Sequence, residues 1–303
     1  MTMERDIMRL LEEQGPLTGA DILNATHEDI LLLWRCCMIS SALTIRNIGR
    51  RYLRLDRRIK GFARLSPSIL REFLTYSVIG FASDHNSLNQ RADEISSHIE
   101  EVTRSKSELA YEIISAAMDR FENKALVCEQ SAIFIAGDIV YNMAHDVPRP
   151  ERSTGKLVKG SDMDIVVVVD DRFPRPRMET LDDIIYQEKQ RILMTPHIRE
   201  EIDYIVKDMA RVREQIRFDT FRHMVACKIL EEGALLYGSE DLFSTIKQML
   251  REEGVTQKLN NLEGQAEGFR RDAQKHLLGE DPQKIREEYL YLFYPTEESE
   301  EFE

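Results

Sequence analysis

The 303-residue sequence predicts an α+β fold, with a small helical domain at the N-terminus followed by a sheet domain flanked by helices. Two observations predict this class. The first 62 residues hold three helical patterns and a pair of short alternating segments. From residue 132 onward, short apolar runs typical of buried strands alternate with helical segments. The chain is long enough for two domains of ordinary size.

Three predicted helices open the chain. Apolar residues at helical spacing predict the first helix over residues 4–14, and Gly15-Pro16 ends it. Thr18 can cap a short second helix, and residues 26–29 form a capping signal before the third, which starts at Ile30. The third helix follows two acids and is rich in leucine. It therefore packs inside the domain or forms a dimer face, as alternatives to entering a groove of nucleic acid.

Two alternating segments, Leu43–Arg46 and Tyr52–Leu55, flank a turn that contains Asn and Gly, which predicts a hairpin. Three helices followed by a hairpin is the element order of the winged helix-turn-helix. Residues 1–62 resemble the winged-helix domains that open many bacterial two-domain proteins. The resemblance implies a nucleic-acid-binding N-terminal domain.

The remainder of the chain divides into three predicted parts. Residues 63–130 are predicted to be a helical connector that ends in a long polar helix, and residues 131–252 to be the mixed sheet domain. Residues 253–303 are predicted to be a helical C-terminal extension whose acidic tail, 297–303, is disordered. Within the sheet domain we expect strands at 132–136, 164–169, 202–206 and 234–237, and helices at 138–145, 180–194 and 207–231.

Charge is distributed unevenly along the chain. The formal net charge of -13 excludes a molecule that binds polyanions with its whole surface. Between residues 46 and 64, however, eight Arg and Lys residues face a single acid, Asp56. Such a cluster predicts phosphate contacts, the alternative being a solvated basic face. The candidate nucleic-acid-binding residues are Arg46, Arg50, Arg51 and Arg54.

The cysteines and the apolar runs indicate the compartment. Cys36, Cys37, Cys128 and Cys227 have neither zinc-site spacing nor the pattern of a disulfide framework. No apolar run has the length of a membrane span, and the polar N-terminus is not a signal peptide. We therefore expect a cytoplasmic protein with no membrane partner. The oligomeric state stays open.

Two carboxylates stand at the start of an uninterrupted apolar run. Asp162 and Asp164 lead into Ile165–Val169, which predicts a strand buried on both faces. Side chains two apart in a strand point to the same side, so these carboxylates repel unless a cation lies between them. Asp203 begins a later strand. Three carboxylates on adjacent strands can hold two Mg²⁺ or Mn²⁺ ions and support phosphoryl transfer.

On these residues, the segment 132–250 resembles the DNA polymerase β-like nucleotidyltransferase superfamily in its minimal bacterial form. The matching elements are Ile135-Ala136-Gly137-Asp138, then Ser161-Asp162-Met163-Asp164-Ile165, then Ile202-Asp203-Tyr204-Ile205, and finally the closing strand in residues 232–238. The resemblance implies that Asp162, Asp164 and Asp203 bind metal and carry catalysis. It also implies that Gly137 approaches the triphosphate.

The candidate nucleotide-binding residues are Gly137, Gly160, Ser161 and Lys159. One of the family's features differs, because its Gly-Ser turn is replaced here by Gly137-Asp138, whose carboxylate would repel a triphosphate unless it turned away. The basic loop 148–159 could supply phosphate contacts instead, through Arg149, Arg152, Lys156 and Lys159.

The function that the resemblance implies is metal-dependent transfer of a nucleoside monophosphate from an NTP to a hydroxyl, with RNA, a protein or a small molecule as acceptor. By analogy, the setting is a toxin or a phage-defence system. Two alternatives stay open. One is a nucleic-acid-binding regulator with a catalytically inactive nucleotidyltransferase fold, and the other is a scaffold whose long helices assemble oligomers.

Overall fold

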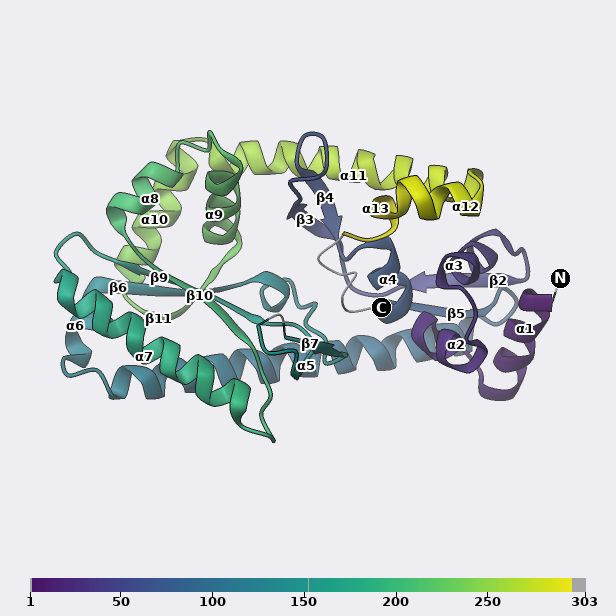
Figure 1. Ribbon diagram of the computed structural model, residues 1–303, viewed down its shortest axis with the longest axis horizontal. Helices are drawn as coiled ribbons and strands as arrows, with labels where there is room; N and C mark the ends of the chain where they lie inside the picture. Colours follow the sequence, from purple (N-terminus) through teal and green to yellow (C-terminus); the bar gives the residue numbers. More distant parts are fainter. Residues whose placement is uncertain (1, 152, 296–303) are drawn as a thin grey trace. The chain divides into compact units, whose positions relative to one another are not determined.

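The computed structural model describes residues 2–151 and 153–295, and its class is α+β with a mixed sheet, as the sequence predicts. The chain divides into two compact units (Figure 1). The first contains the chain up to His98 and again from Glu263, and the second is Ile99–Leu262. These limits differ from the predicted domains, since they fall inside α5 (His85–Asp119) and α11 (Val255–Gly279). Arg152 and the acidic tail, both named above, lie outside the described residues.

The first unit begins with the three predicted helices, α1 (Thr2–Gln14), α2 (Gly19–Thr26) and α3 (Ile30–Ile39). The predicted cap at Thr18 forms as a complete capping box, in which its hydroxyl accepts from the Asp21 N–H and its own N–H donates to the Asp21 carboxylate. The Asp29 carboxylate accepts from the Leu32 N–H at 2.9 Å and caps α3. Local capping chemistry therefore places both helices.

The other elements before α5 are β1 (Leu17–Thr18), β2 (Leu43–Asn47), β3 (Tyr52–Leu55), β4 (Ala63–Ser66), α4 (Ile69–Thr75) and β5 (Ser77–Phe81). The predicted hairpin is wrong, because β2 pairs with β5 and β3 pairs with β4, both antiparallel. Ile48 is buried and its N–H donates to the Tyr76 carbonyl at 2.8 Å, which holds the chain after β2 against the start of β5. Alternation identifies each strand, but it does not identify the partner.

The helical connector predicted over residues 63–130 is wrong for residues 63–66 and 77–81, which form β4 and β5, while α4 between them is helical as predicted. β5 is the middle strand of a three-stranded sheet with the order β1-β5-β2, and its residues are almost fully buried. Continuous burial removes the alternation that would have distinguished this strand from a helix. The long polar helix predicted next does form, as α5.

The C-terminal segment completes the core of the first unit. Its elements after α11 are α12 (Pro282–Lys284), the π-helical turn η2 (Ile285–Tyr289) and α13 (Leu290–Phe293). Phe293 is fully buried, and its ring centroid lies 5.4 Å from that of Trp34 on α3. The predicted helical C-terminal extension therefore belongs to the first unit from Glu263 onward, where its last helices add to the apolar cluster around α3.

The second unit contains the elements that follow α5: α6 (Lys124–Gln130), β6 (Ser131–Ala136), the 3₁₀ turn η1 (Gly137–Ile139), β7 (Pro148–Pro150), β8 (Leu157–Lys159), β9 (Met163–Val169), α7 (Arg175–Met194), β10 (Ile202–Asp208), α8 (Met209–Gln215), α9 (Phe221–Glu232), β11 (Ala234–Gly238) and α10 (Glu240–Glu252). All four predicted strands form. The helix predicted at 138–145 is only the short turn η1, and the helix predicted at 207–231 is two helices, α8 and α9.

The strands β6, β9, β10 and β11 form one mixed sheet with the order β10-β9-β6-β11. β9 runs parallel to β10 and antiparallel to β6, while β11 pairs antiparallel with β6. β9 is buried over its whole apolar length, as expected for β-branched residues covered on both faces.

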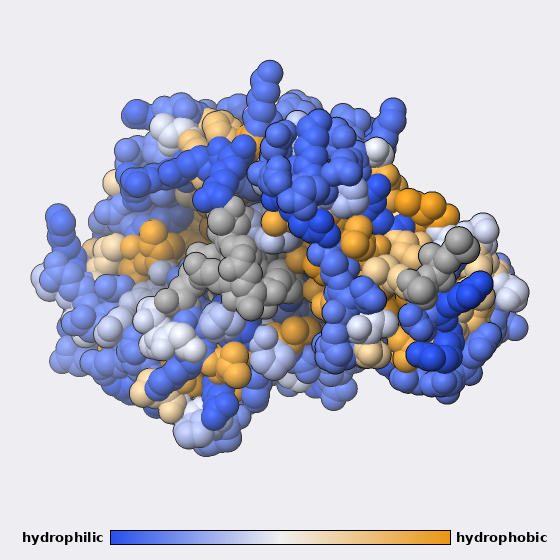
Figure 2. Space-filling model, turned by 45° about the vertical axis from the view of Figure 1, so that its right-hand side comes forward, coloured by the Kyte–Doolittle hydropathy of each residue, from blue (hydrophilic) through white to orange (hydrophobic). Residues whose placement is uncertain are grey.

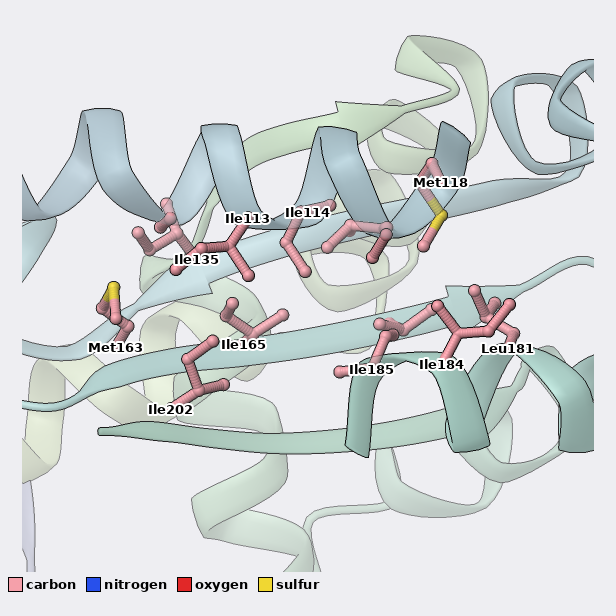
Figure 3. Packing of buried hydrophobic residues seen from close by; sticks show 14 of the residues in the cluster. Ile113, Ile114, Met118, Ile135, Met163, Ile165, Leu181, Ile184, Ile185 and Ile202 are labelled. Carbon is pink, nitrogen blue, oxygen red and sulfur yellow. The ribbon is translucent and has the colours of Figure 1, made fainter. Parts of the chain in front are cut away.

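Two groups of helices cover the faces of this sheet (Figure 1). On one face, Met163 and Ile165 of β9 pack with Ile114 of α5 and Leu181 of α7 in a single buried cluster, part of which Figure 3 shows. On the other face lie α8, α9 and α10, and the ring centroids of Phe134 in β6 and Phe243 in α10 are 5.0 Å apart. Alternate residues of β6 and β9 therefore serve two separate apolar layers.

Hydrophilic side chains cover most of the face in Figure 2, and apolar side chains gather there in separate patches. Within the described part of the chain, no helix combines the length and the apolar composition needed to cross a membrane.

We predict that Ile114→Ala lowers the free energy of unfolding by about 2–5 kcal/mol, because the fully buried side chain leaves a cavity between α5 and the sheet. The control, Glu112→Ala, changes an exposed residue of the same helix and should stay within about 0.5 kcal/mol of wild type. Urea unfolding of both variants measures the difference. Equal stabilities would contradict the packing of α5 on this face.

Candidate metal and nucleotide site

The sheet register brings the three predicted carboxylates to one end of neighbouring strands. Asp164 of β9 is the direct pairing partner of Asp203 in β10, and it faces Ala136 at the end of β6. Directly paired residues place their side chains on the same face of a sheet. Asp162 lies two residues before Asp164, just ahead of β9. The face that they share is the one opposite Met163 and its apolar cluster.

Burial and neighbouring acids raise the pKa values of Asp164 and Asp162. Burial, then the charges of Asp162, Asp138, Asp203 and Glu232, hold the pKa of the Asp164 carboxyl well above its ordinary value. The side chain of Asp162 keeps 39% of its surface exposed. Desolvation by the surrounding protein and the charge of Asp138 nevertheless raise its pKa, and the charge of Arg149 partly offsets the increase. Ionised carboxylates at this end of the strands therefore repel one another.

Asp138 and Ser161 connect two loops beside the acids. The Ser161 hydroxyl donates to the Asp138 carboxylate at 2.6 Å and accepts from the His145 N–H at 3.2 Å, and the Ser161 N–H donates to the His145 carbonyl. Gly160 has φ +61°, and a Cβ there would lie 2.0 Å from the His145 carbonyl oxygen. Gly160 thus permits the close crossing of the two loops. The carboxylate that replaces the expected turn hydroxyl is held by the hydroxyl of Ser161.

Gly137 occupies the turn that directly follows β6. Its φ is +70°, and a Cβ there would lie 2.1 Å from Oδ2 of Asp164, so only glycine lets this carboxylate approach the turn. The Gly137 N–H donates to the Glu232 carboxylate at 3.4 Å. Glu232, at the end of α9, also accepts from the Tyr141 hydroxyl at 2.6 Å and pairs with Lys228. The amide that the family resemblance assigns to a phosphate is thus bonded to a carboxylate of the chain itself.

Cations flank the acid cluster on two sides. Arg149 of β7 lies 2.9 Å from Glu201 and 3.8 Å from Asp162, and it donates to the Gly160 carbonyl at 2.8 Å. Lys189 of α7 lies 3.9 Å from the Asp203 carboxylate, whose side chain is 68% exposed. These side chains partly neutralise the acids and could also meet a phosphate.

Lys159, a predicted nucleotide-binding residue, does not join the acid cluster. Its ammonium donates to the His197 carbonyl at 3.2 Å, in the loop before β10. Its own carbonyl accepts from Lys106 at 2.6 Å, and Lys106 is buried in an ion pair with Glu200. These bonds connect the end of β8 to α5 and to the loop before β10. They support a structural role for Lys159.

The donor set can be compared with the needs of a metal ion. Within residues 2–151 and 153–295, no three His, Cys, Asp or Glu side chains already converge on one position. Asp162 and Asp164 nevertheless supply two repelling carboxylates on one face, and Mg²⁺ commonly binds through one or two carboxylates while keeping several waters. The chemistry of this pair fits Mg²⁺ or Mn²⁺, with Asp203 in register as a third donor.

The predicted nucleic-acid contacts lie in the first unit and have partners of their own. Arg51 donates two hydrogen bonds to the Glu72 carboxylate, at 2.6 and 2.9 Å, and Arg46 bonds to Asn89. Arg64, in the same basic cluster, is buried in an ion pair with Asp56. Arg50 is exposed and Arg54 half-buried. The cluster therefore includes structural ion pairs that its linear sequence does not reveal.

The third helix is covered by the end of the chain. Trp34 and three other α3 residues are buried, and the Arg35 guanidinium donates to the Glu280 and Leu278 carbonyls at 2.7 and 3.0 Å. This outcome agrees with the alternative in which α3 packs inside its domain. The exposed basic residues instead include Arg57, Arg58 and Lys60, between β3 and β4.

Sequence reasoning missed Glu232, Tyr141 and Lys228. The spacing of Lys228 and Glu232 predicts an ordinary ion pair on a helix surface, and nothing in the sequence connects that pair to the Gly137 turn. The sequence shows Asp138 only as a departure from the family's Gly-Ser turn, whereas in the structure its charge raises the pKa values of both Asp162 and Asp164.

A scan against known protein families finds no match to this chain, and a search of curated proteins finds no significant relative.

We predict that Asp164→Asn stabilises the metal-free protein at about pH 7. An unfolded Asp titrates near pH 4, and folding raises this pKa, so wild-type stability falls as pH rises through that interval. The variant should gain about 1.4 kcal/mol for each pKa unit of the increase, and the gain should vanish below about pH 4. Urea unfolding across pH measures it, with the exposed Asp183→Asn as the control. A variant less stable than wild type at neutral pH would contradict the repulsion.

Proposed function

We propose that the second unit is a metal-dependent nucleotidyltransferase of the DNA polymerase β-like type, which moves a nucleoside monophosphate from an NTP to a hydroxyl. One observation carries the proposal: Asp164 and Asp203 are paired in register on parallel strands, beside Asp162, in a cluster that raises the pKa of Asp164. The strand order and the Gly137 turn after β6 also support it.

Each residue has a distinct role in the proposed reaction. Asp162 and Asp164 hold the metal, which when bound would offset the phosphate charge and stabilise the attacking and leaving oxygens. Asp203 accepts the proton of the acceptor hydroxyl. The hydroxyl oxygen forms a bond to the α-phosphorus, the bond between the α-phosphorus and its bridging oxygen breaks, and pyrophosphate leaves. Arg149 and Lys228 lie beside the acids and can contact phosphate oxygens.

The contact between Glu232 and Gly137 favours the second candidate function, a regulator whose transferase fold does not catalyse. A carboxylate on the turn amide competes with a phosphate for that amide. The first unit fits a regulator, since the chain order α1-β1-α2-α3-β2 and the sheet order β1-β5-β2 support a winged-helix-like domain with β3, β4 and α4 inserted before its last strand. The basic residues of β3 and of its turn to β4 would then contact phosphates.

We predict label transfer when the full-length protein is incubated with each α-³²P-labelled NTP, Mg²⁺ or Mn²⁺, and total RNA, protein extract or small-molecule acceptors. The double variant Asp162→Asn/Asp164→Asn should lose at least about 100-fold in rate, because both proposed metal ligands lose their charge. The variant Asp183→Asn, exposed on α7, should retain the activity. Absence of transfer with every NTP, metal and acceptor would refute the enzyme and favour the regulator.

For the basic region, we predict that Arg50→Gln/Arg54→Gln weakens binding to duplex DNA uniformly across sequences. If each side chain contacts one phosphate, the slope of log Kobs against log salt should decrease in magnitude by about 2. Fluorescence anisotropy at several salt concentrations measures this. Arg5→Gln/Arg9→Gln removes two exposed charges from α1 and serves as the control. An unchanged slope in the first variant would assign these residues to the solvated face.

A further inference from the structure

β10 is an edge strand of the four-stranded sheet. All of its residues, Ile202–Asp208, pair with β9 on one side, and the strand order ends at β10. Within the described residues, no strand pairs with its other side. An edge strand carries a row of backbone N–H and C=O groups that can pair with another chain.

The side chains of this edge are exposed and chemically distinct. The Asp203 side chain is 68% exposed, Ile205 is 50% exposed, and Asp208 is also exposed. Lys207, the cation of the strand, is buried and donates to Gln215 at 2.8 Å. Asp203 and Ile205 therefore lie on one face of the strand, and Asp208, whose carboxylate also accepts from the Arg211 N–H and caps α8, lies on the other.

The position of Asp203 joins this edge to the candidate site. A strand paired with β10 would place one residue directly opposite Asp203, with its side chain on the face that holds Asp162 and Asp164. Directly opposite residues in a sheet have Cβ atoms about 5 Å apart. A hydroxyl at that position would lie next to the carboxylate that accepts its proton in the proposed reaction.

We infer that β10 takes up an extended segment of a partner protein as an additional strand, and that this segment carries the hydroxyl that the site modifies. The inference rests on the proposed function and names its acceptor class. The segment has a Ser, Thr or Tyr opposite Asp203, an apolar residue two positions along opposite Ile205, and a basic residue five positions along opposite Asp208.

Charge and length distinguish this acceptor from the others. The exposed carboxylates of Asp203 and Asp208 repel the phosphates of an RNA and attract a basic segment. A small molecule is too short to form hydrogen bonds along the whole length of β10. In the transfer step, the segment's hydroxyl oxygen bonds to the α-phosphorus of the NTP, its proton passes to Asp203, and pyrophosphate leaves with the electrons of the broken bond.

The experiment uses full-length protein and fluorescent peptides of about ten residues, the length of a long strand. Each peptide contains the hydroxyl, apolar and basic residues at the inferred spacing, in forward and reversed order. Two further series carry N-methyl groups on alternate backbone amides, one series on each set. Anisotropy measures binding without any need for catalysis. We expect one N-methylated series to bind like the parent peptide and the other to lose binding, because only alternate amides face β10.

A variant tests the apolar contact. Ile205→Lys should weaken binding about tenfold, since burial of one large apolar side chain is worth that much. Ile39→Lys replaces another exposed isoleucine, at the end of α3, and should bind as wild type does. Peptides that fail to bind, or that bind equally in both N-methylated series, overturn the inference.

Three other outcomes separate the inference from the proposed function. Label transfer to RNA or to a small molecule, without peptide binding, overturns the inference and leaves the transferase standing. Selective peptide binding without transfer from any NTP supports β10 as the docking strand and refutes the transferase. A wild-type dimer in sedimentation that Ile205→Lys dissociates assigns the edge to a second copy and overturns the partner segment.

Discussion

Repulsion among carboxylates at the end of a buried strand is the constraint on which the second unit depends. β9 is covered on both faces, so its position is set by the apolar layers around it and not by its acids. The acids at its start are thereby held together against their mutual repulsion, and burial together with that repulsion raises the pKa of Asp164. The free energy gained by apolar packing keeps these acids close together although their charges repel. A cation bound between the carboxylates would reduce this repulsion. Acids with such raised pKa values are common at functional sites.

The loops around the acids are organised to tolerate this density of charge. Gly137 leaves room for the Asp164 carboxylate, and Gly160 lets the segment at His145 cross closely. Ser161 holds Asp138, while Tyr141 and Lys228 hold Glu232. Each extra acid thus has a donor. The same donors could bind phosphate oxygens. In an enzyme, a nucleotide would displace the Glu232 carboxylate from the Gly137 amide, whereas in an inactive fold Glu232 would keep that hydrogen bond.

The first unit uses its charges differently. Arg51 and Arg64, which belong to the basic cluster, are committed to Glu72 and Asp56. Trp34 and Arg35 of α3 are committed to the last helices of the chain. A basic sequence is therefore only in part a basic surface, and a helix such as α3, which packs inside its own unit, is not available to nucleic acid. The exposed basic residues near β3 are Arg50, which precedes the strand, and Arg57, Arg58 and Lys60 in its turn to β4.

Local chemistry in the sequence was sufficient for the caps at Thr18 and Asp29, for the strands that became β6, β9, β10 and β11, and for the shared face of Asp162 and Asp164. These features depend on neighbours a few residues apart, where side-chain period and hydrogen-bond geometry leave little choice. Tertiary structure alone decided that β2 pairs with β5, that the end of the chain covers α3, and that Glu232 reaches Gly137. Partners separated by dozens of residues are selected by packing in three dimensions, and no local pattern encodes that selection.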